Sequence, residues 1–440
     1  MGKNNLLFSV IGLGFSLSVG ASSVPNRVLV KFREGEVSVS STIQNHPATR
    51  SLGVASRLLS LKQQVSLVRY STSMTPAEAA RALESLPNVE WAQPDYVVGI
   101  FPQPQDEENM DVSPDYSFIG AFKTLVNKPT PVKAPSMPSP PVVDPRLPET
   151  WGLTKIEAPA AWHSQKGNRK VIVADIDTGI DYRHEDLVNN LWEGIGYDFS
   201  GNQPLPFDDN QHGTHTAGTI GATGGNGLGV SGVSPEVSVM AIKFISKEGS
   251  GTTSDAIRSI DFAIEHGARI MSNSWGGHGD AKDDENKALE EAVERANKAD
   301  ILFVAAAGND GTDNDVDNVF PAGYRNPNVL TVASISPKDA ISFFSNYGKE
   351  SVHVAAPGGG VLSTIPDNKY AKFNGTSMAC PHVAGLAALI LAERPNLTAV
   401  QVKQIIMETV DSLPSLQGKT VTGGRINARA ALERAKQFAI

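Results

Sequence analysis

Cysteine is almost absent from this sequence: among 440 residues, Cys380 is the single one. An internal disulfide is therefore excluded, and a packed core must hold the fold. Basic residues are fewer than acidic ones: there are 38 lysines and arginines and 47 aspartates and glutamates, which gives a formal net charge of −9. No contiguous basic stripe offsets this deficit, so we expect no binding of nucleic acid. The 40% of hydrophobic and 19% of charged residues are typical of a soluble globular protein, here long enough for more than one domain.

Long hydrophobic runs are also missing, except for one close to the N-terminus. Residues 6–19 are largely apolar, follow the basic Lys3 and lead into the small residues Gly20 and Ala21. A basic start, a short apolar core and small residues at a cleavable site are typical of a secretory signal peptide, and a buried N-terminal helix is the alternative. We expect residues 1–22 to be this signal and the protein to be secreted, either to a periplasm or to the medium. We expect no later segment to reach transmembrane length, and hence no membrane anchor.

Residues 23–98 have the pattern of a small α/β domain. Residues 27–32 and 65–70 alternate between apolar and polar side chains, as half-buried strands do. A helix is expected to begin at Thr75, because Thr75 and Glu78 have the spacing of a capping box.

The composition changes over residues 99–148, where prolines recur, most densely at residues 135–141. Such a segment sustains neither helix nor sheet, so it is interpreted as an exposed Pro-rich linker. From residue 149 to residue 440, near-continuous apolar runs alternate with helical patterns. These runs are typical of parallel strands buried on both faces, so the expected fold is α/β: a doubly wound, mostly parallel sheet with flanking helices. Its site should lie at the carboxyl ends of the strands.

Three separated positions carry side chains suited to nucleophilic catalysis. Asp177 ends the first strand of the large domain, His212 opens a helical run, and Ser377 opens a longer one. A serine at a helix N-terminus directs backbone N–H groups toward a developing oxyanion, and a histidine held by an aspartate can act as its base. The chain order Asp, His, Ser is one of those on which this chemistry has converged. Cys380, three residues after Ser377, is interpreted as a small buried hydrophobe.

Four segments in this order together resemble the subtilisin family of serine proteases: DTGID at 177–181, HGTHTAG at 212–218, AAAGN at 305–309 and GTSMA at 375–379. The resemblance extends from Trp151 to the C-terminus. It implies a serine endopeptidase that hydrolyses protein or peptide substrates through Asp177, His212, Ser377 and an acyl-enzyme. It also implies that Asn309 donates its side-chain amide to the oxyanion.

The module at residues 23–98 resembles the propeptide of the same family. This resemblance implies a zymogen whose own propeptide acts as an intramolecular inhibitor and folding template. Final trimming is then expected between Gly99 and Asp144. Nothing in the sequence demands assembly, so a monomer is expected.

Substrate-binding residues follow from the same resemblance. Ser274, Trp275 and Gly276 correspond to the extended segment that pairs with the substrate backbone. Ala306 and Gly308 correspond to one wall of the primary pocket. No charge is evident there, so an apolar or medium-sized residue is expected before the scissile bond.

A structural calcium ion is a further implication of the resemblance. The glycine-rich residues 224–229 resemble the family's calcium loop, with Asn226 and Asp186 as oxygen ligands of the kind that a hard cation prefers. The family's N-terminal glutamine ligand is expected to be replaced by an apolar residue near Leu147. The acidic residues 313–317 could hold a second ion, but a solvated loop is the favoured interpretation.

Three alternatives remain. His212 and His215 have a spacing that also fits a zinc pair, but no glutamate follows in the metalloprotease arrangement, so His215 is interpreted as a packed residue. Asp175 lies on the same strand face as Asp177 and should either titrate high or find a partner. It could also be the aspartate that orients His212, although the turn after Asp177 favours Asp177. A catalytically silent scaffold that binds peptides would keep this fold, and the intact catalytic pattern argues against it.

Overall fold

The structure is a computed structural model that describes most of the chain. The described residues are 22–33, 43, 46–47, 49, 52, 59–60, 65–104, 143–278 and 286–438. The expected signal peptide, apart from Ser22, lies outside them, and so do residues 105–142 of the expected linker.

The N-terminal module is an antiparallel sheet covered by a helix. Its elements are β1 (Ser23–Phe32), β2 (Leu59–Ser60), β3 (Val65–Arg69), α2 (Pro76–Glu84) and β4 (Val89–Ile100). β1 lies between β3 and β4 and pairs with both. The helix begins at the predicted capping box, in which the Thr75 hydroxyl accepts the Glu78 N–H and the Glu78 carboxylate accepts the Thr75 N–H. Apolar side chains of β1, β3, β4 and α2 form a core of their own.

The large domain is built on a nine-stranded sheet. In spatial order its strands are β17 (Asp411–Ser412), β18 (Gly424–Arg425), β14 (Val354–Pro357), β13 (Val329–Ile335), β11 (Leu302–Ala306), β9 (Ile270–Asn273), β5 (Gly167–Asp177), β7 (Glu236–Lys243) and β6 (Leu191–Asp198). From β18 to β6 every neighbouring pair is parallel, and β17 pairs antiparallel with β18. The expectation of a mostly parallel sheet is confirmed.

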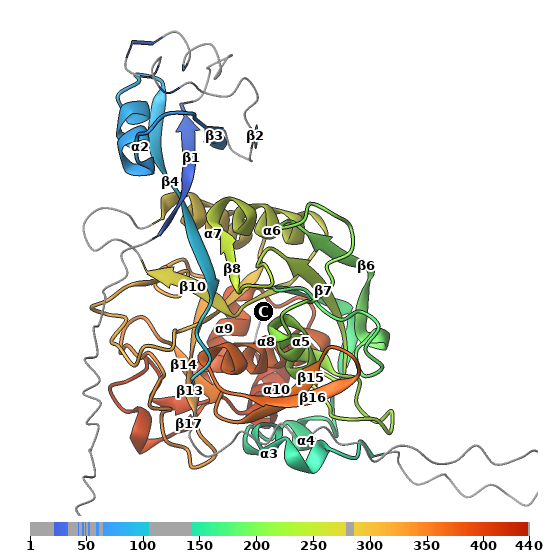
Figure 1. The fold of residues 1–440 in the computed structure, drawn as a ribbon. Coiled ribbons are helices and arrows are strands. Elements are labelled where there is room, and N and C mark those ends of the chain that lie inside the picture. Colours follow the sequence, from blue (N-terminus) through green and yellow to red (C-terminus); the bar gives the residue numbers. More distant parts are fainter. Residues whose placement is uncertain are drawn as a thin grey trace, which may run out of the picture.

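Helices cover both faces of this sheet (Figure 1). Val173 of β5 packs in one cluster with α5 (His212–Gly221) and α8 (Thr376–Glu393). Ala174 and Ile176 of the same strand pack in the other, with α6 (Thr253–Glu265) and α7 (Lys287–Lys298). Alternate residues of a strand point to opposite faces, so an all-apolar strand requires helices on both sides. The remaining helical elements are η2 (Leu147–Glu149), α3 (Trp151–Lys155), α4 (Ala158–Ala161), η3 (Val188–Asn190), α9 (Ala399–Glu408), η4 (Pro414–Leu416) and α10 (Ala428–Gln437).

The prediction about transmembrane length was wrong for one helix. By length and apolar composition, α8 alone among the described helices could cross a membrane. However, 89% of its residues are buried inside the protein, as in the central helix of a soluble core. Helices on the inside of a large domain are apolar all round, so composition does not separate the two cases.

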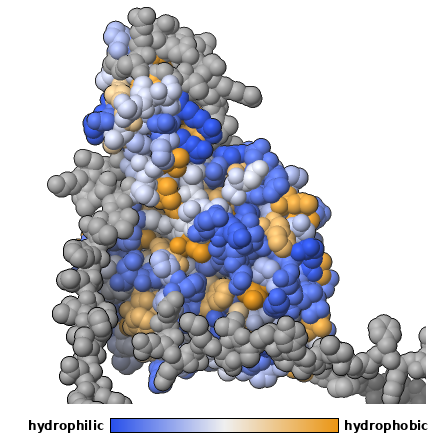
Figure 2. All heavy atoms as spheres, in the orientation of Figure 1, coloured by the Kyte–Doolittle hydropathy of each residue, from blue (hydrophilic) through white to orange (hydrophobic). Residues whose placement is uncertain are grey.

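β4 connects the N-terminal module to the large domain (Figure 1). Its last residues pair antiparallel with β8 (Ser250–Thr252) on one side and with β10 (Trp275–His278) on the other. β10 in turn pairs with β12 (Val319–Phe320), so this small sheet belongs to both bodies. Gly99 and Ile100, which the sequence analysis assigns to the linker, are therefore part of β4. In the space-filling view, apolar residues follow the course of β4 between more hydrophilic surfaces (Figure 2).

A separate antiparallel hairpin lies over α5. It consists of β15 (Val361–Ile365) and β16 (Lys369–Phe373). The hydroxyls of Ser363 and Thr364 donate to the carbonyls of His215 and Thr214, which ties the hairpin to the helix. Parallel strands β13 and β14 lead the chain from the sheet into this hairpin and then into α8.

Candidate active site

Asp177 and His212 meet at the carboxyl end of β5. The Asp177 Oδ1 atom lies 2.7 Å from His212 Nδ1, and both side chains are buried. A carboxylate in this position fixes the imidazole in the tautomer that carries its proton on Nδ1 and leaves Nε2 free to accept one. Asp175 makes no such bond to His212, so the structure favours Asp177 as the orienting aspartate.

A second carboxylate fixes the start of α5. Asp208 lies in the loop before the helix, where its Oδ2 atom accepts the Thr214 N–H at 2.9 Å and the Thr214 hydroxyl at 2.6 Å. Its Oδ1 atom accepts the Thr178 hydroxyl at 2.9 Å, which connects the helix to the turn after Asp177. Carboxylates at a helix N-terminus satisfy free N–H groups and complement the dipole. Asp208 was not predicted from the sequence, although a carboxylate just before a helix is a recognisable capping signal.

Ser377 occupies the first turn of α8, beside β9 and β10. Its Oγ atom donates to the Ser274 carbonyl at 3.1 Å, and the Ser274 hydroxyl donates to the Ser377 carbonyl at 2.8 Å. His212 Nε2 is buried without a hydrogen-bond partner among the described residues. The serine and the histidine are thus not bonded to each other. Catalytic hydrogen bonds of this type often form only with a productively bound substrate.

Asn309 follows β11 and points its amide at a main-chain carbonyl. Its Nδ2 atom donates to the carbonyl of Pro102 at 3.0 Å. Its Oδ1 atom accepts the N–H and the hydroxyl of Thr376, both at 2.9 Å, which fixes the orientation of the amide. An amide held in this way can stabilise negative charge on the oxygen that it contacts. Thr376, which orients the amide, was not singled out from the sequence.

The end of β4 and the four residues after it, 101–104, contact the site. Gly99 and Ile100 pair with Gly276 and Trp275 of β10, and the Ile100 N–H donates to the Gly249 carbonyl at 3.1 Å. This is the backbone pairing expected between the protein and a substrate. Downstream of Pro102, the Gln103 amide nitrogen approaches the Met378 sulfur at 4.0 Å, which leads the chain past the start of α8.

Two of the expected substrate-binding residues, Trp275 and Gly276, pair with the end of β4. Gly276 faces the ring of Phe101 so closely that a Cβ atom on Gly276 would lie 2.6 Å from the Phe101 Cζ atom. Ala306 belongs to the same buried cluster as Phe101. Gly308 has a φ of +115°, a conformation that favours glycine, and its N–H donates to the Thr376 hydroxyl. Trp275 is buried, with its ring 4.9 Å from that of Phe244.

His215 and Cys380 have structural surroundings. His215 Nε2 lies within hydrogen-bond distance of the Val361 and Ala371 carbonyls, and its ring stacks on Phe373 with a centroid distance of 4.4 Å. Burial lowers the pKa of His215 to about 3, so the ring is neutral, and its Nε2 atom can donate to a carbonyl of the hairpin. Burial raises the pKa of the Cys380 thiol to about 12, which makes it a poor nucleophile.

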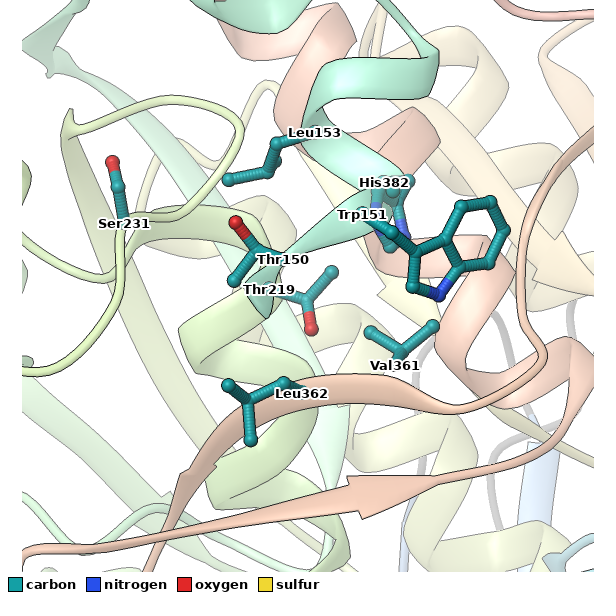
Figure 3. A pocket seen from close by; sticks show the side chains of 9 residues that line it. Thr150, Trp151, Leu153, Thr219, Ser231, Val361, Leu362 and His382 are labelled. Carbon is teal, nitrogen blue, oxygen red and sulfur yellow. The ribbon is translucent and has the colours of Figure 1, made fainter. Parts of the chain in front are cut away.

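A pocket near α3 lies apart from these residues (Figure 3). Trp151, Thr219, Leu362 and His382 are among the residues that line it, and none of the residues named above for catalysis does so. Burial lowers the pKa of His382 to about 4, and its Nδ1 atom is 2.8 Å from the Met378 carbonyl. His382 is therefore a neutral side chain that braces the second turn of α8.

The expected calcium loop brings together two carboxylates. Asp186 accepts the Asn226 side-chain amide at 2.7 Å and the Val230 N–H at 2.9 Å. Asp144 accepts the N–H groups of Gly225 and Asn226 at 2.8 and 3.0 Å. The replacement of the glutamine ligand by an apolar residue near Leu147 stays a prediction, and the carboxylate of Asp144 also reaches this loop from the N-terminal side.

The chemistry of this loop suits a hard cation. Asp144 and Asp186 are buried and take their bonds from neutral N–H and O–H donors, including the Tyr370 hydroxyl on Asp186. Asn226 faces Asp186 with its amide nitrogen, and its oxygen accepts the Leu228 N–H at 2.8 Å, so the oxygen would reach an ion only after a 180° turn that breaks this bond. Within the described ranges, no group of three or more His, Cys, Asp or Glu side chains is arranged for a metal.

The acidic residues 313–317 form a hydrogen-bonded turn. Asp315 accepts the N–H and the hydroxyl of Ser351 at 2.9 and 2.6 Å, and the N–H of Glu350 at 3.0 Å. These bonds hold two surface loops together. They favour the loop interpretation over a second ion site.

The N-terminal module caps two helices of the large domain. The Asp95 carboxylate accepts the N–H and the hydroxyl of Ser254 at the start of α6, each at 2.9 Å. The side-chain amide oxygen of Gln93, Oε1, accepts the Ala288 N–H at the start of α7 at 3.0 Å. Residues of the N-terminal module thus accept hydrogen bonds from free N–H groups at the ends of two helices of the large domain. This makes the contact between the module and the large domain specific.

Family models match both bodies of the chain. A model of the subtilase family matches residues 168–429, and a model described as the fervidolysin N-terminal prodomain matches residues 17–95. The first match spans more than half of the chain and includes Asp177, His212, Asn309 and Ser377.

Several curated proteins are similar to the large domain. The thermophilic serine proteinase of Bacillus sp. (strain AK1) is 40% identical over 272 residues, which are 62% of this chain and 64% of that protein. Subtilisin-like protease 2 of Plasmodium falciparum is 37% identical over 303 residues, or 64% of this chain and 22% of that protein. Thermitase of Thermoactinomyces vulgaris is 38% identical over 283 residues, or 64% of this chain and 95% of thermitase. The matched region thus covers less than two thirds of the length of the first two relatives.

The parallel sheet, the arrangement of Asp177, His212 and Ser377 at its carboxyl edge, and the family matches agree with one another. The chain belongs to the subtilase family and carries a prodomain of the fervidolysin type before its peptidase domain.

Proposed function

We propose that this protein is a serine endopeptidase made as a zymogen. Two observations support the proposal: Asp177 Oδ1 lies 2.7 Å from His212 Nδ1, and the Asn309 amide holds the carbonyl of Pro102, two residues after a strand that pairs with β10 as a substrate would. A binding scaffold needs the strand pairing but has no need of a buried aspartate–histidine pair. Peptide or protein chains in extended form are the proposed substrates.

The reaction follows from the positions of these groups. Ser377 Oγ leaves the Ser274 carbonyl, attacks the peptide carbonyl carbon and gives its proton to His212 Nε2. Asp177 stabilises the resulting imidazolium, and the Asn309 amide stabilises the oxyanion. His212 then protonates the leaving amine, which departs and leaves an acyl ester on Ser377. Water gives a proton to His212, attacks the ester and releases the acid, and Ser377 recovers its proton.

The prodomain is proposed to block this site in the zymogen. Phe101 lies against Gly276 of the segment that is expected to pair with substrate, and the Asn309 amide holds the carbonyl of the next residue, Pro102. These contacts, together with the prolines at 102 and 104, support a segment that fills the cleft and is cut slowly. Maturation within residues 99–144 would then free the cleft, and export would follow from a signal at residues 1–22.

Calcium is proposed as a structural ion of the mature enzyme. Asp144, Asp186 and the Asn226 oxygen would hold it, and it would supply positive charge to two buried carboxylates. By holding Asp144 on the loop at residues 224–229, these contacts tether the start of the peptidase domain to its body.

A serine-directed phosphonate tests the proposed function. The matured wild-type protein is expected to be labelled once, at Ser377, and to lose casein hydrolysis. Ser377→Ala should give neither labelling nor hydrolysis, whereas Ser164→Ala, a serine that bonds only the Ala161 carbonyl, should behave as wild type. An unlabelled and inactive wild-type protein that still binds peptides would instead establish the silent scaffold.

A further inference from the structure

Asp175 is an acid buried beneath the proposed catalytic pair. It lies in β5, two residues before Asp177 and on the same face of the sheet, and it is 1% exposed. The neighbouring strands oppose it with Ala241 of β7 and Ser272 of β9, neither of which is charged. A carboxylate here would be isolated from solvent and from basic partners on the adjacent strands.

The Thr216 hydroxyl lies between two oxygen atoms that compete for its one proton. The Thr216 Oγ atom lies 2.9 Å from Asp175 Oδ2 and 3.0 Å from the Gly213 carbonyl. A hydroxyl has one proton, and a carbonyl can only accept. When Thr216 donates to Gly213, the Asp175–Thr216 contact is a hydrogen bond only if Asp175 is the donor, which requires a neutral carboxylic acid.

The second oxygen of Asp175 supports the same protonation state. Asp175 Oδ1 is buried and has no hydrogen-bond partner within the described part of the chain. An ionised carboxylate carries about half of its charge on each oxygen, and burying such an oxygen without a hydrogen bond costs free energy. The carbonyl oxygen of a neutral acid is uncharged, so its burial costs less.

Nearby charges act in the same direction. Burial, and then the negative charge of Asp177 with a further contribution from Asp208, raise the pKa of Asp175 well above its usual range. On α8 the nearest titratable group is Cys380, which stays a neutral thiol. On β7, Lys243 is in register with Asp177, but its ammonium group donates to Thr178, Asp209 and Ile245. His212 on α5 is bonded to Asp177.

We propose that Asp175 is a neutral carboxylic acid in the working enzyme and acts as a positioning residue by donating its proton to Thr216. Thr216 lies one turn after His212 in α5, so this bond holds the histidine helix against the strand that carries Asp177. Asp177 then remains the single anion that His212 faces from β5. The proposal rests on the proposed function for its catalytic consequence, and on the burial and hydrogen-bond geometry of Asp175 for the protonation state.

The pH dependence of catalysis tests the consequence. Asp175→Asn replaces the acid O–H by an amide N–H that can donate to Thr216, so kcat/KM at pH 7 should fall less than in Thr216→Val. In wild type, ionisation of Asp175 at alkaline pH adds a second buried anion, and kcat/KM should fall there. The fall should be absent in Asp175→Asn. Thr216→Val should lower kcat at least about tenfold through misplacement of His212, and Thr216→Ser should restore it.

Infrared spectroscopy tests the protonation state without any need for activity. In the full-length Ser377→Ala protein at pH 8, the carbonyl stretch of a protonated carboxylic acid is expected, and it should vanish when Asp175→Asn is added. Thr216→Val should shift this band, because the hydrogen bond is lost. If Ser377→Ala has no such band at pH 8, or if Asp175→Asn leaves it unchanged, the proposal is overturned. A protein that shows the band but never hydrolyses peptides would contradict the proposed function alone.

Discussion

Residues of the same type have different tasks in this protein because their surroundings differ. Asp177 accepts a hydrogen bond from His212, while Asp175, two residues earlier on the same strand, contacts a hydroxyl and is otherwise enclosed. His212 has a free Nε2 atom, whereas His215 is bonded to carbonyls of the hairpin. The assignment of roles therefore comes from partners and burial, and residue type alone does not give it.

Asn309→Ala should lower kcat on the order of a hundred- to a thousandfold with little change in KM, because the amide acts on charge that develops in the transition state. Steady-state kinetics on a peptide substrate measure both constants. Asn202→Ala, at an exposed asparagine far from Ser377 in the sequence, is the matched control and should leave them unchanged. If both variants lower kcat equally, Asn309 has no specific role in catalysis.

At the scale of elements, local signals predicted what local interactions determine. The capping box at Thr75, the strand ending in Asp177 and the helices opened by His212 and Ser377 are all encoded within a few residues. Contacts between segments distant in the sequence could not be predicted in this way. Asp144 lies 81 residues before Gly225, and no local pattern near Asp144 predicts their contact. The extension of β4 over Gly99 and Ile100 likewise depends on edges supplied by β8 and β10.

The loop at residues 224–229 should bind calcium. In the Ser377→Ala protein, which cannot digest itself, calcium at a hundred times its Kd should add about 2.7 kcal/mol to the free energy of unfolding relative to a chelator. Thermal unfolding with and without calcium measures this difference. Asp186→Asn should abolish it, and Asp198→Asn, whose carboxylate caps a separate turn, should retain it. A wild-type loop that is indifferent to calcium would argue for a purely hydrogen-bonded structure.

Asp95 should stabilise the docked prodomain through α6. Loss of a helix cap costs about 1 kcal/mol, so Asp95→Ala in the full-length Ser377→Ala protein should lower the free energy of unfolding by that amount. Urea denaturation gives the value. Glu90→Ala removes a carboxylate of the same module that is more exposed and pairs with Lys31, and it should have a smaller effect. If the two variants are equivalent, the cap does not contribute to docking.

For the whole molecule, buried neutral histidines connect stability to pH. Burial lowers the pKa of His215 and His353 to about 3 and that of His382 to about 4. The unfolded chain binds these protons near pH ~6.5, so it takes up protons that the folded protein excludes. Their contribution to stability is complete above that pH and falls progressively as the pH decreases toward 3 to 4.

Acid should therefore destabilise the full-length Ser377→Ala protein already between pH 7 and pH 5. The urea midpoint at the two pH values measures the effect. His353→Gln should reduce the pH dependence, and His163→Gln, at an exposed histidine, should leave it as it is. A midpoint that stays constant from pH 7 to pH 5 would contradict neutral buried histidines.

The contact between the N-terminal module and the large domain leads to the expectation that the chain cuts itself. β4 delivers residues 99–104 across Ser377, and Asn309 already holds a carbonyl of this segment. The most direct measurement is the intact mass, over time, of the purified full-length protein beside Ser377→Ala. The wild type is expected to separate into a prodomain and a peptidase domain by a cut between residues 99 and 144, as its labelling by a phosphonate appears, while Ser377→Ala stays whole. A wild type that stays whole and unlabelled, or a Ser377→Ala protein that cuts itself equally fast, would contradict the account.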